Sequence, residues 1–127
     1  MFSIDKFTQK PIYEQIIDGI EKDIILGVLC EGGAIPSVRE LSLSLGINPN
    51  TIQKAYIELE RRNIIVPIPG RGSFVSSGAV DAIRARAEQK LDDILDIARE
   101  LCVAGVEYEK VLSAIARAYH QTKEEEK

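Results

Sequence analysis

Side chains that could serve as nucleophiles or metal ligands are scarce in this chain of 127 residues. Cys30 and Cys102 are far apart and neither belongs to a CxxC motif, so two reduced, half-buried thiols are favoured over a redox pair. The single histidine, His120, lies near a polar tail and outside any cluster with zinc-ligand spacing. Neither a glycine-rich phosphate loop nor a nucleophile elbow is recognisable. We therefore expect no catalytic residue, no metal site and no cofactor, which argues against an enzyme.

Basic residues gather in the middle of the chain, although the whole chain has a net charge of -4 and a pI of about 5.1. The segment from Pro36 to Val75 has five basic and three acidic residues, which gives it a charge of +2. The segment from Ser76 onward has eight basic and eleven acidic residues, which gives it a charge of -3. Because the distribution of charge matters more than its sum, the acidic total does not exclude nucleic acid as a partner of the middle segment.

The composition is that of a folded globular chain, with 45% hydrophobic and 28% charged residues. A mass of 14.1 kDa favours one domain, or one small domain with an appendage. No apolar run approaches the roughly 18 residues of a membrane span, and the N-terminus lacks the pattern of a secretory signal. We therefore expect a cytoplasmic protein with no membrane partner.

A first helix is predicted by an N-terminal proline, an apolar stripe and a C-terminal glycine. Pro11 suits the first helical turn, isoleucines recur every fourth residue from Ile12 to Ile24, and Gly27 fits a C-terminal stop. After a glycine pair, residues 34–36 are predicted to form a short extended arm.

Two short helices are predicted next, and both have strong capping signals. Ser37 and Glu40 form a capping box that opens a helix ending at Gly46. Asn48 caps a third helix, which has Pro49 in its first position and the inward residues Ile52, Ala55, Tyr56 and Leu59. Two short helices joined by a glycine-containing turn are typical of a helix-turn-helix, although a compact corner in an ordinary helical domain has the same pattern.

A β-hairpin is predicted to follow, with strands at 64–66 and 73–75 and a tight loop at 67–72. A helix-turn-helix followed by a hairpin is the arrangement of a winged helix. Arg71 lies between two glycines, so the backbone of the loop can approach another surface closely. An ordinary hairpin with a solvated arginine is the alternative.

The rest of the chain, after a break at 76–78, has two apolar repeats with steps of three and four residues. The first predicts one helix of roughly 23 residues, with the apolar positions Val80, Ile83, Ala87, Leu91, Ile94, Ala98 and Leu101. The second begins after Gly105 and has the apolar positions Tyr108, Val111, Leu112, Ile115, Ala116 and Tyr119. The last five residues are expected to be a frayed tail. Two helices cannot form a complete core, so we expect a second copy of the chain to cover them, the alternative being that they fold back on the first part.

Four blocks of sequence, in this order, resemble the winged-helix domain of GntR-family transcriptional regulators: 11–16, 35–41, 46–56 and 70–75. The resemblance covers roughly residues 9–76, and the short two-helix tail resembles the YtrA-like subfamily. It implies a mainly α fold with a small β-hairpin, in which residues 1–76 are the DNA-binding winged helix-turn-helix and 77–127 form an α-helical dimerisation hairpin. The implied function is that of a homodimeric bacterial repressor that binds double-stranded operator DNA. In this family the repressed operon often encodes an ABC transporter.

The resemblance also implies which residues contact DNA: Ser37, Arg39, Asn48, Asn50, Thr51, Gln53, Gly70 and Arg71, with Gly72 in the same wing block. The ammonium of Lys54 and the hydroxyl of Tyr56 are further candidates on chemical grounds. Amides at the start of the recognition helix can pair with adenine and Arg39 with guanine, while Lys54 and Arg71 neutralise phosphate and add affinity without sequence information. Arg61 and Arg62 have the same potential role, or belong to a solvated helix end. Tyr56 either binds phosphate or is a core tyrosine. Two such helices in a dimer predict a pseudo-palindromic operator.

Two departures from the family pattern are visible. The arm reads Gly32-Gly33-Ala34, so the acidic and basic residues usual there are missing, and the wing at 66–69 is unusually apolar. An apolar wing and an acidic tail also suit a protein-interaction module without specific DNA binding, which is the alternative function. The effector ligand, if one exists, is not identified by any cluster of residues, and the shortage of ligands disfavours a metal.

Overall fold

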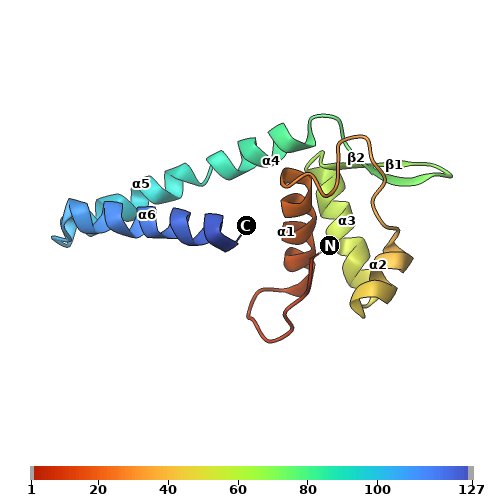
Figure 1. The fold of residues 1–127 in the computed structure, drawn as a ribbon, viewed down its shortest axis with the longest axis horizontal. Helices are drawn as coiled ribbons and strands as arrows, with labels where there is room; N and C mark the ends of the chain where they lie inside the picture. The colour runs from red at the N-terminus through yellow and green to blue at the C-terminus, as the bar shows by residue number, and fades with distance from the viewer. Residues whose placement is uncertain (1, 126–127) are drawn as a thin grey trace. The chain divides into compact units, whose positions relative to one another are not determined.

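The computed structural model describes residues 2–125, and their contacts divide the chain into a unit that ends at Arg86 and a unit that begins at Ala87 (Figure 1). The first unit follows the order α1 (Ile12–Ile25), α2 (Val38–Leu45), α3 (Pro49–Arg61), β1 (Ile65–Ile68), β2 (Gly72–Val75) and most of α4 (Ala79–Glu88). The second contains α5 (Leu91–Val103) and α6 (Tyr108–Glu125). The predicted fold class, mainly α with a small β-hairpin, is confirmed.

The core of the first unit lies where α1 packs on α3. It is almost entirely aliphatic, in line with an aromatic content of only 6%, and its fully buried side chains include Ile16, Ile17, Ile20, Leu41, Ile52, Leu59, Ile64 and Val75. The isoleucine stripe of α1 supplies one wall and the inward residues of α3 supply the facing wall. This packing holds the outward face of α3 on a rigid support.

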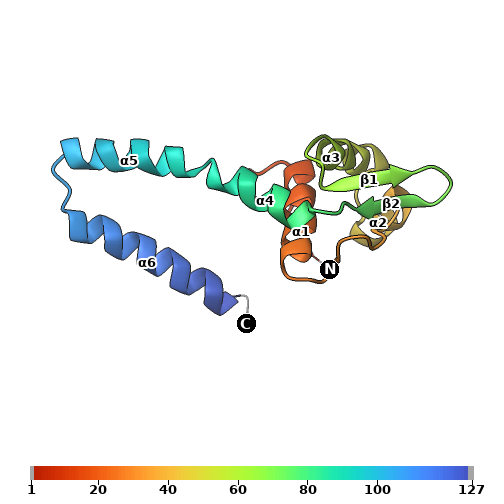
Figure 2. The same cartoon turned by 90° about the horizontal axis from the view of Figure 1, so that it is seen from above.

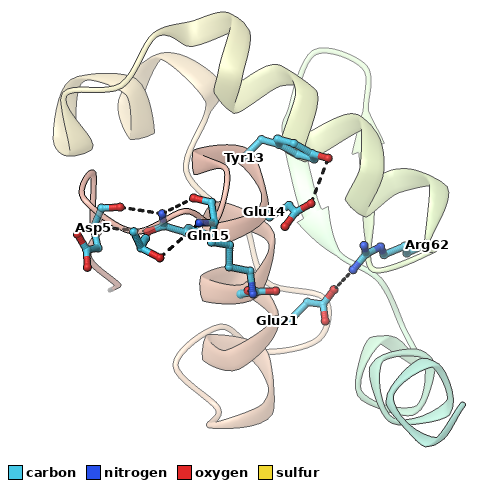
Figure 3. A network of polar contacts seen from close by, with 9 residues as sticks. Asp5, Tyr13, Glu14, Gln15, Glu21 and Arg62 are labelled. Atoms are coloured by element: carbon cyan, nitrogen blue, oxygen red, sulfur yellow. Dashed lines mark hydrogen bonds and ion pairs between the residues drawn. The ribbon is translucent and has the colours of Figure 1, made fainter. Parts of the chain in front are cut away.

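Gln15 ties the N-terminal segment to α1 with three hydrogen bonds (Figure 3). Its side-chain carbonyl accepts from the Asp5 backbone N–H at 2.8 Å, and its amide donates to the carbonyls of Asp5 at 2.8 Å and Lys10 at 3.0 Å. The Phe2 ring lies directly against Gly19, where a Cβ would meet it at 2.3 Å. The segment before α1 is thereby fixed on the helix.

The helix-turn-helix forms where the caps predict it. Ser37 Oγ accepts from the Glu40 N–H at 3.0 Å, and Gly46 ends α2 in the left-handed conformation with φ 66°. Ser42 Oγ donates to the Ile47 carbonyl at 2.6 Å, which fixes the turn while the Ile47 side chain is buried beneath it. Asn48 Oδ1 then accepts from the Asn50 N–H at 2.8 Å at the start of α3.

The β-hairpin, or wing, has longer strands and a shorter loop than predicted. β1 and β2 pair antiparallel from Ile65 with Val75 to Ile68 with Gly72, so Pro67, Ile68 and Gly72 belong to strands rather than to the loop. The Arg71 N–H donates to the Ile68 carbonyl at 2.9 Å across a turn of Pro69 and Gly70. Gly70 has φ 78°, as the third residue of a type II turn requires. Pro67 is tolerated because β1 is an edge strand.

The predicted arm is held against the other edge of β2. Ala34 bridges to Phe74, the Ile35 N–H donates to the Ser73 carbonyl at 3.0 Å, and the Gly32 N–H donates to the Val75 carbonyl at 2.8 Å. β2 therefore lies between β1 and the arm. Backbone bonds tether the arm, so the missing charged residues are not required for this contact.

The single long helix predicted for residues 80–101 is wrong, because α4 and α5 are separate. At Gln89 and Lys90 the chain forms a turn whose hydrogen bonds span three residues instead of the four of an α-helix. The Lys90 N–H donates to the Ala87 carbonyl at 3.0 Å, and the Asp93 N–H donates to the Lys90 carbonyl at 3.1 Å. The residues around the break are exposed, so no tertiary contact holds a regular helix there. Neither glycine nor proline marks it.

The first unit also extends beyond residue 76, the predicted end of the winged helix. Ala79 and Ile83 of α4 are buried in its core, and Val80 packs against that core. Glu31 Oε1 accepts from the Val80 N–H at 3.1 Å, which caps the start of α4. Of the residues predicted to form the dimer interface, Ile83 is therefore buried in the winged-helix unit, and Val80 is half-buried against the same core.

In the second unit, α5 and α6 meet only near the turn that joins them. Figure 2 shows the two helices spreading apart from this turn toward the C-terminus. Consistent with this, the half-buried residues of the unit are Ala98, Leu101, Val106 and Val111, and neither helix contains a buried residue. The predicted frayed tail is helical as far as Glu125, and Glu126 and Lys127 lie outside the described residues.

Candidate nucleic-acid interface

The outward face of α3 is the centre of the candidate interface. Residue spacings of three and four place one set of exposed side chains on this face: Asn50, Gln53, Lys54, Ile57 and Arg61. The opposite face is buried in the core through Ile52, Ala55, Tyr56 and Leu59. The face therefore offers amides and cations from a helix whose other side is immobile.

Tyr56 belongs to the core and not to the interface. Its ring is buried, and its hydroxyl donates a hydrogen bond of 2.6 Å to the Pro36 carbonyl. Burial, with a smaller contribution from the charge of Glu40, raises the pKa of this phenol. Of the two interpretations of Tyr56, this geometry favours the core tyrosine, whose hydroxyl holds the arm that leads into α2.

The remaining predicted contacts are spread over the start of α2, the start of α3 and the wing. Arg39, Asn50, Gln53 and Lys54 are exposed, and Thr51 is half-buried. Ser37 and Asn48 are also exposed, but the oxygen of each side chain is engaged in capping its own helix. Their primary task is to shape the helix ends, which leaves the hydroxyl hydrogen of Ser37 and the amide nitrogen of Asn48 for an outside partner.

Arg61 and Arg62 are held by carboxylates within the protein. Arg61 makes bonds of 2.5 and 2.7 Å to Glu58, and Arg62 makes a bond of 3.0 Å to the same carboxylate. Arg62 also makes a bond of 2.6 Å to Glu21 of α1 (Figure 3). The bonds from Arg61, followed by those from Arg62, lower the pKa of Glu58 to about 2. A structural role for Arg62 therefore replaces the phosphate role considered from the sequence, which missed Glu21 as its partner.

Three other cations of the unit have no such partner. Within residues 2–125, Arg39, Lys54 and Arg71 form no ion pair with a carboxylate. The ammonium nitrogen of Lys54 instead lies 3.9 Å from the centroid of the Tyr13 ring on α1. Sequence reasoning missed Tyr13, although its position beside the isoleucine stripe of its helix was a signal.

The tip of the wing presents Arg71 between two glycines with positive φ. Gly70 has φ 78° and Gly72 has φ 104°, values that other residues adopt only with strain. Apart from the adjoining residues, no atom of residues 2–125 lies within 4 Å of where a Cβ would be at either position, so the backbone here is open to an approaching surface. Val66 and Ile68 of β1 are also exposed.

Comparison with known proteins assigns the chain to a family. The model described as "Bacterial regulatory proteins, gntR family" matches residues 12–75. The HTH-type transcriptional repressor YtrA of Bacillus subtilis (strain 168) is 40% identical over 115 residues, covering 87% of this chain and 86% of that protein. The chain belongs to the GntR family. The YtrA-like resemblance seen in the sequence is thereby confirmed.

Solved structures match most of the chain or a part of it. A transcriptional antiterminator from Listeria monocytogenes EGD-e has 36% identity and a TM-score of 0.72, covering 96% of this chain and 91% of that one. The DNA-binding domain of AraR, solved in complex with its operator ORE1, has 26% identity and a TM-score of 0.52, covering 60% of this chain and 93% of that one. A GntR domain is a DNA-binding unit of transcription regulators, so this chain is a regulator and not an enzyme.

Other features of this GntR chain concern alternative chemistry. Cys30 and Cys102 are free thiols, and both are exposed rather than half-buried as predicted. In the described part of the chain, no group of three histidine, cysteine or acidic side chains is arranged to hold a metal. None of the helices described here is long and apolar enough to cross a membrane.

Proposed function

We propose that this GntR protein is a homodimeric repressor that binds a pseudo-palindromic operator. The observation that carries the proposal is the outward face of α3, where the amides of Asn50 and Gln53 lie beside the unpaired Lys54 on a helix with a buried inner side. Similarity to the repressor YtrA supports the direction of regulation. The YtrA-like resemblance supports a transporter operon as the proposed target. The proposed action on chromosomal DNA supports a cytoplasmic location.

The proposed contacts divide into those that read sequence and those that add affinity. Asn50 and Gln53 pair with adenine, Arg39 pairs with guanine, and each bidentate pair contributes about 1–3 kcal/mol of discrimination between bases. Lys54 and Arg71 neutralise phosphates, and the glycines at 70 and 72 bring the wing close to the minor groove. Ser37, Asn48 and Thr51 support the helix ends near the DNA backbone.

The dimer is proposed to form through the uncovered faces of α5 and α6. Apolar positions on these faces repeat with helical spacing and are exposed or half-buried: Leu91, Ile94, Leu95, Ala98, Leu101, Val111, Leu112, Ile115 and Tyr119. Ala87, near the end of α4, belongs to the same apolar repeat and is also exposed. An apolar surface of this extent is unfavourable in water, and a second copy covers it with the same residues. Leu95 joins the set predicted from sequence because it is 52% exposed on the same side of α5.

The test is fluorescence anisotropy of the protein on DNA upstream of its own gene and on scrambled DNA, at several salt concentrations. We expect two chains per site, preference for the upstream DNA, and affinity that falls steeply with salt as counterions are released. If the protein shows no preference for the upstream DNA, selection of bound fragments from random sequences will locate the operator. A protein that selects no sequence and shows no salt dependence is the interaction module that the apolar wing also suits.

A further inference from the structure

Lys54 is held by an aromatic ring instead of a carboxylate. Its ammonium nitrogen lies 3.9 Å from the centroid of Tyr13, well inside the range of about 6 Å over which a ring attracts a cation. Lys54 is exposed on the face of α3 that also presents Asn50 and Gln53. A residue of α1, outside the helix-turn-helix, therefore contacts a cation of the candidate interface.

We propose that Tyr13 is a positioning residue for DNA binding, whose ring orients the Lys54 ammonium toward a backbone phosphate. The inference rests on the proposed function, since it concerns the same DNA-binding face. A free lysine has a flexible four-carbon stem and loses much rotamer freedom when it binds. A ring that already confines the stem reduces that loss.

The choice of a ring over a carboxylate has a direct electrostatic consequence. Glu58 holds Arg61 firmly but neutralises its charge. An aromatic face attracts the cation through its quadrupole and carries no net charge, so Lys54 keeps its full positive charge for the phosphate. Tyr13 thus confines Lys54 without competing with DNA for its charge.

The ring is itself fixed in place by its surroundings. Tyr13 is half-buried and packs against the core, and its hydroxyl lies 3.4 Å from Glu14 Oε1 (Figure 3). α1 and α3 are packed on each other, so the positions of Tyr13 and Lys54 are set by one rigid support. This rigidity makes the contact a property of the free protein and not a product of DNA binding.

The first test is a double-mutant cycle on operator DNA with Tyr13→Leu and Lys54→Met. We expect Tyr13→Leu to weaken binding about 2–5-fold and Tyr13→Phe, which keeps the ring, to stay within about 2-fold of the wild type. Lys54→Met lowers the salt slope by about 0.9, and Tyr13→Leu then has no further effect. Lys22→Met, at an exposed lysine of α1 with no ion pair in residues 2–125, is the matched control and leaves affinity unchanged.

Either of two results would overturn the positioning role. One is an equal loss from Tyr13→Leu with and without Lys54, which would indicate a general loss of structure. The other is a Tyr13→Phe variant as weak as Tyr13→Leu, which would assign the effect to the hydroxyl.

A second measurement, without DNA, separates this inference from the proposed function. The ring current of Tyr13 should shift the NMR signals of the Lys54 ε-methylene protons upfield, in the wild type and in Tyr13→Phe but not in Tyr13→Leu. No upfield shift in a wild type that binds its operator would overturn the inference alone. An upfield shift in a wild type that selects no DNA would overturn the proposed function, and the positioning role with it.

Discussion

Arg62, immediately after α3, donates a hydrogen bond from Nη1 to Glu21 Oε1 on α1 at 2.6 Å, while its Nε donates to Glu58 Oε1 at 3.0 Å. One guanidinium thereby joins the C-terminal end of α3 to α1. All three side chains of this bridge are less than a quarter exposed, so solvent screens the bridge less than it screens an ordinary surface pair.

We expect Glu58→Gln to lower the free energy of unfolding by about 1 kcal/mol near neutral pH, because charge-assisted bonds to two arginines are lost. The pKa of Glu58 is lowered to about 2 by those arginines, from an ordinary value of 4.5. A lowered pKa in the folded state means that the stabilisation is complete above the ordinary value and disappears as the pH falls toward the lowered one. Urea unfolding from about pH 7 to about pH 2.5, at fixed protein concentration, should therefore show the difference between variant and wild type shrinking with acid.

Asp96→Asn is the matched control for that experiment. Asp96 pairs with Arg99 at 3.2 Å, but both side chains are 72% exposed, so its loss should change stability little at any pH. An effect of Glu58→Gln that is the same in acid as at neutral pH would refute the ionic origin of the stabilisation.

Tyr56→Phe tests the assignment of this tyrosine to the core. Loss of the 2.6 Å bond leaves the Pro36 carbonyl without its partner, so we expect the free energy of unfolding to fall by about 1 kcal/mol. Thermal or urea unfolding measures it directly. If the hydroxyl binds phosphate instead, the variant will keep its stability and lose DNA affinity.

Arg39→Ala and Arg71→Ala should differ in what they remove from DNA binding. Arg39 is proposed to read guanine, so its loss should reduce the preference for operator over random DNA by about 1–3 kcal/mol. Arg71 is proposed to add affinity at the wing, so its loss should weaken both DNAs alike and lower the salt slope by about 0.9. Anisotropy on the two DNAs measures both, with Arg84→Ala as an exposed arginine outside the interface. Equal losses for Arg39→Ala on operator and random DNA would remove it from the sequence-reading set.

Leu91→Asp should weaken the proposed dimer, because it places a charge on the apolar face of α5. Sedimentation equilibrium at several concentrations measures the shift toward monomer. Val103→Asp is the matched control, since Val103 is 90% exposed at the end of the same helix and outside the apolar repeat. A Leu91→Asp protein that sediments as the wild type does would place the interface elsewhere.

Features encoded within a few residues could be read from the sequence. Ser37, Gly46 and Asn48 mark the helix ends because their side chains or backbone conformations act on the adjacent turn. Features that depend on distant partners could not. Tyr56 has its acceptor at Pro36 and Arg62 has its carboxylate at Glu21, and no local pattern connects either pair.

The break between α4 and α5 could not be predicted from the sequence for a different reason. The apolar repeat continues through Gln89 and Lys90, and Lys90 keeps a right-handed helical conformation with φ -70°. The sequence therefore contains a continuous helical signal across a turn. Packing of Ile83 on the winged helix, which assigns α4 to the first unit, is likewise a long-range contact.

The arm links the wing to α2 and α3 through hydrogen bonds. Ser73 of β2 accepts from Ile35, the next residue along the arm accepts from Tyr56 of α3, and Ser37 then begins α2. A displacement of the hairpin is thus passed through two hydrogen bonds to the recognition helix. These bonds set the separation between the proposed contacts of α3 and of Arg71, so the proposed interface should favour DNA whose groove widths match that separation.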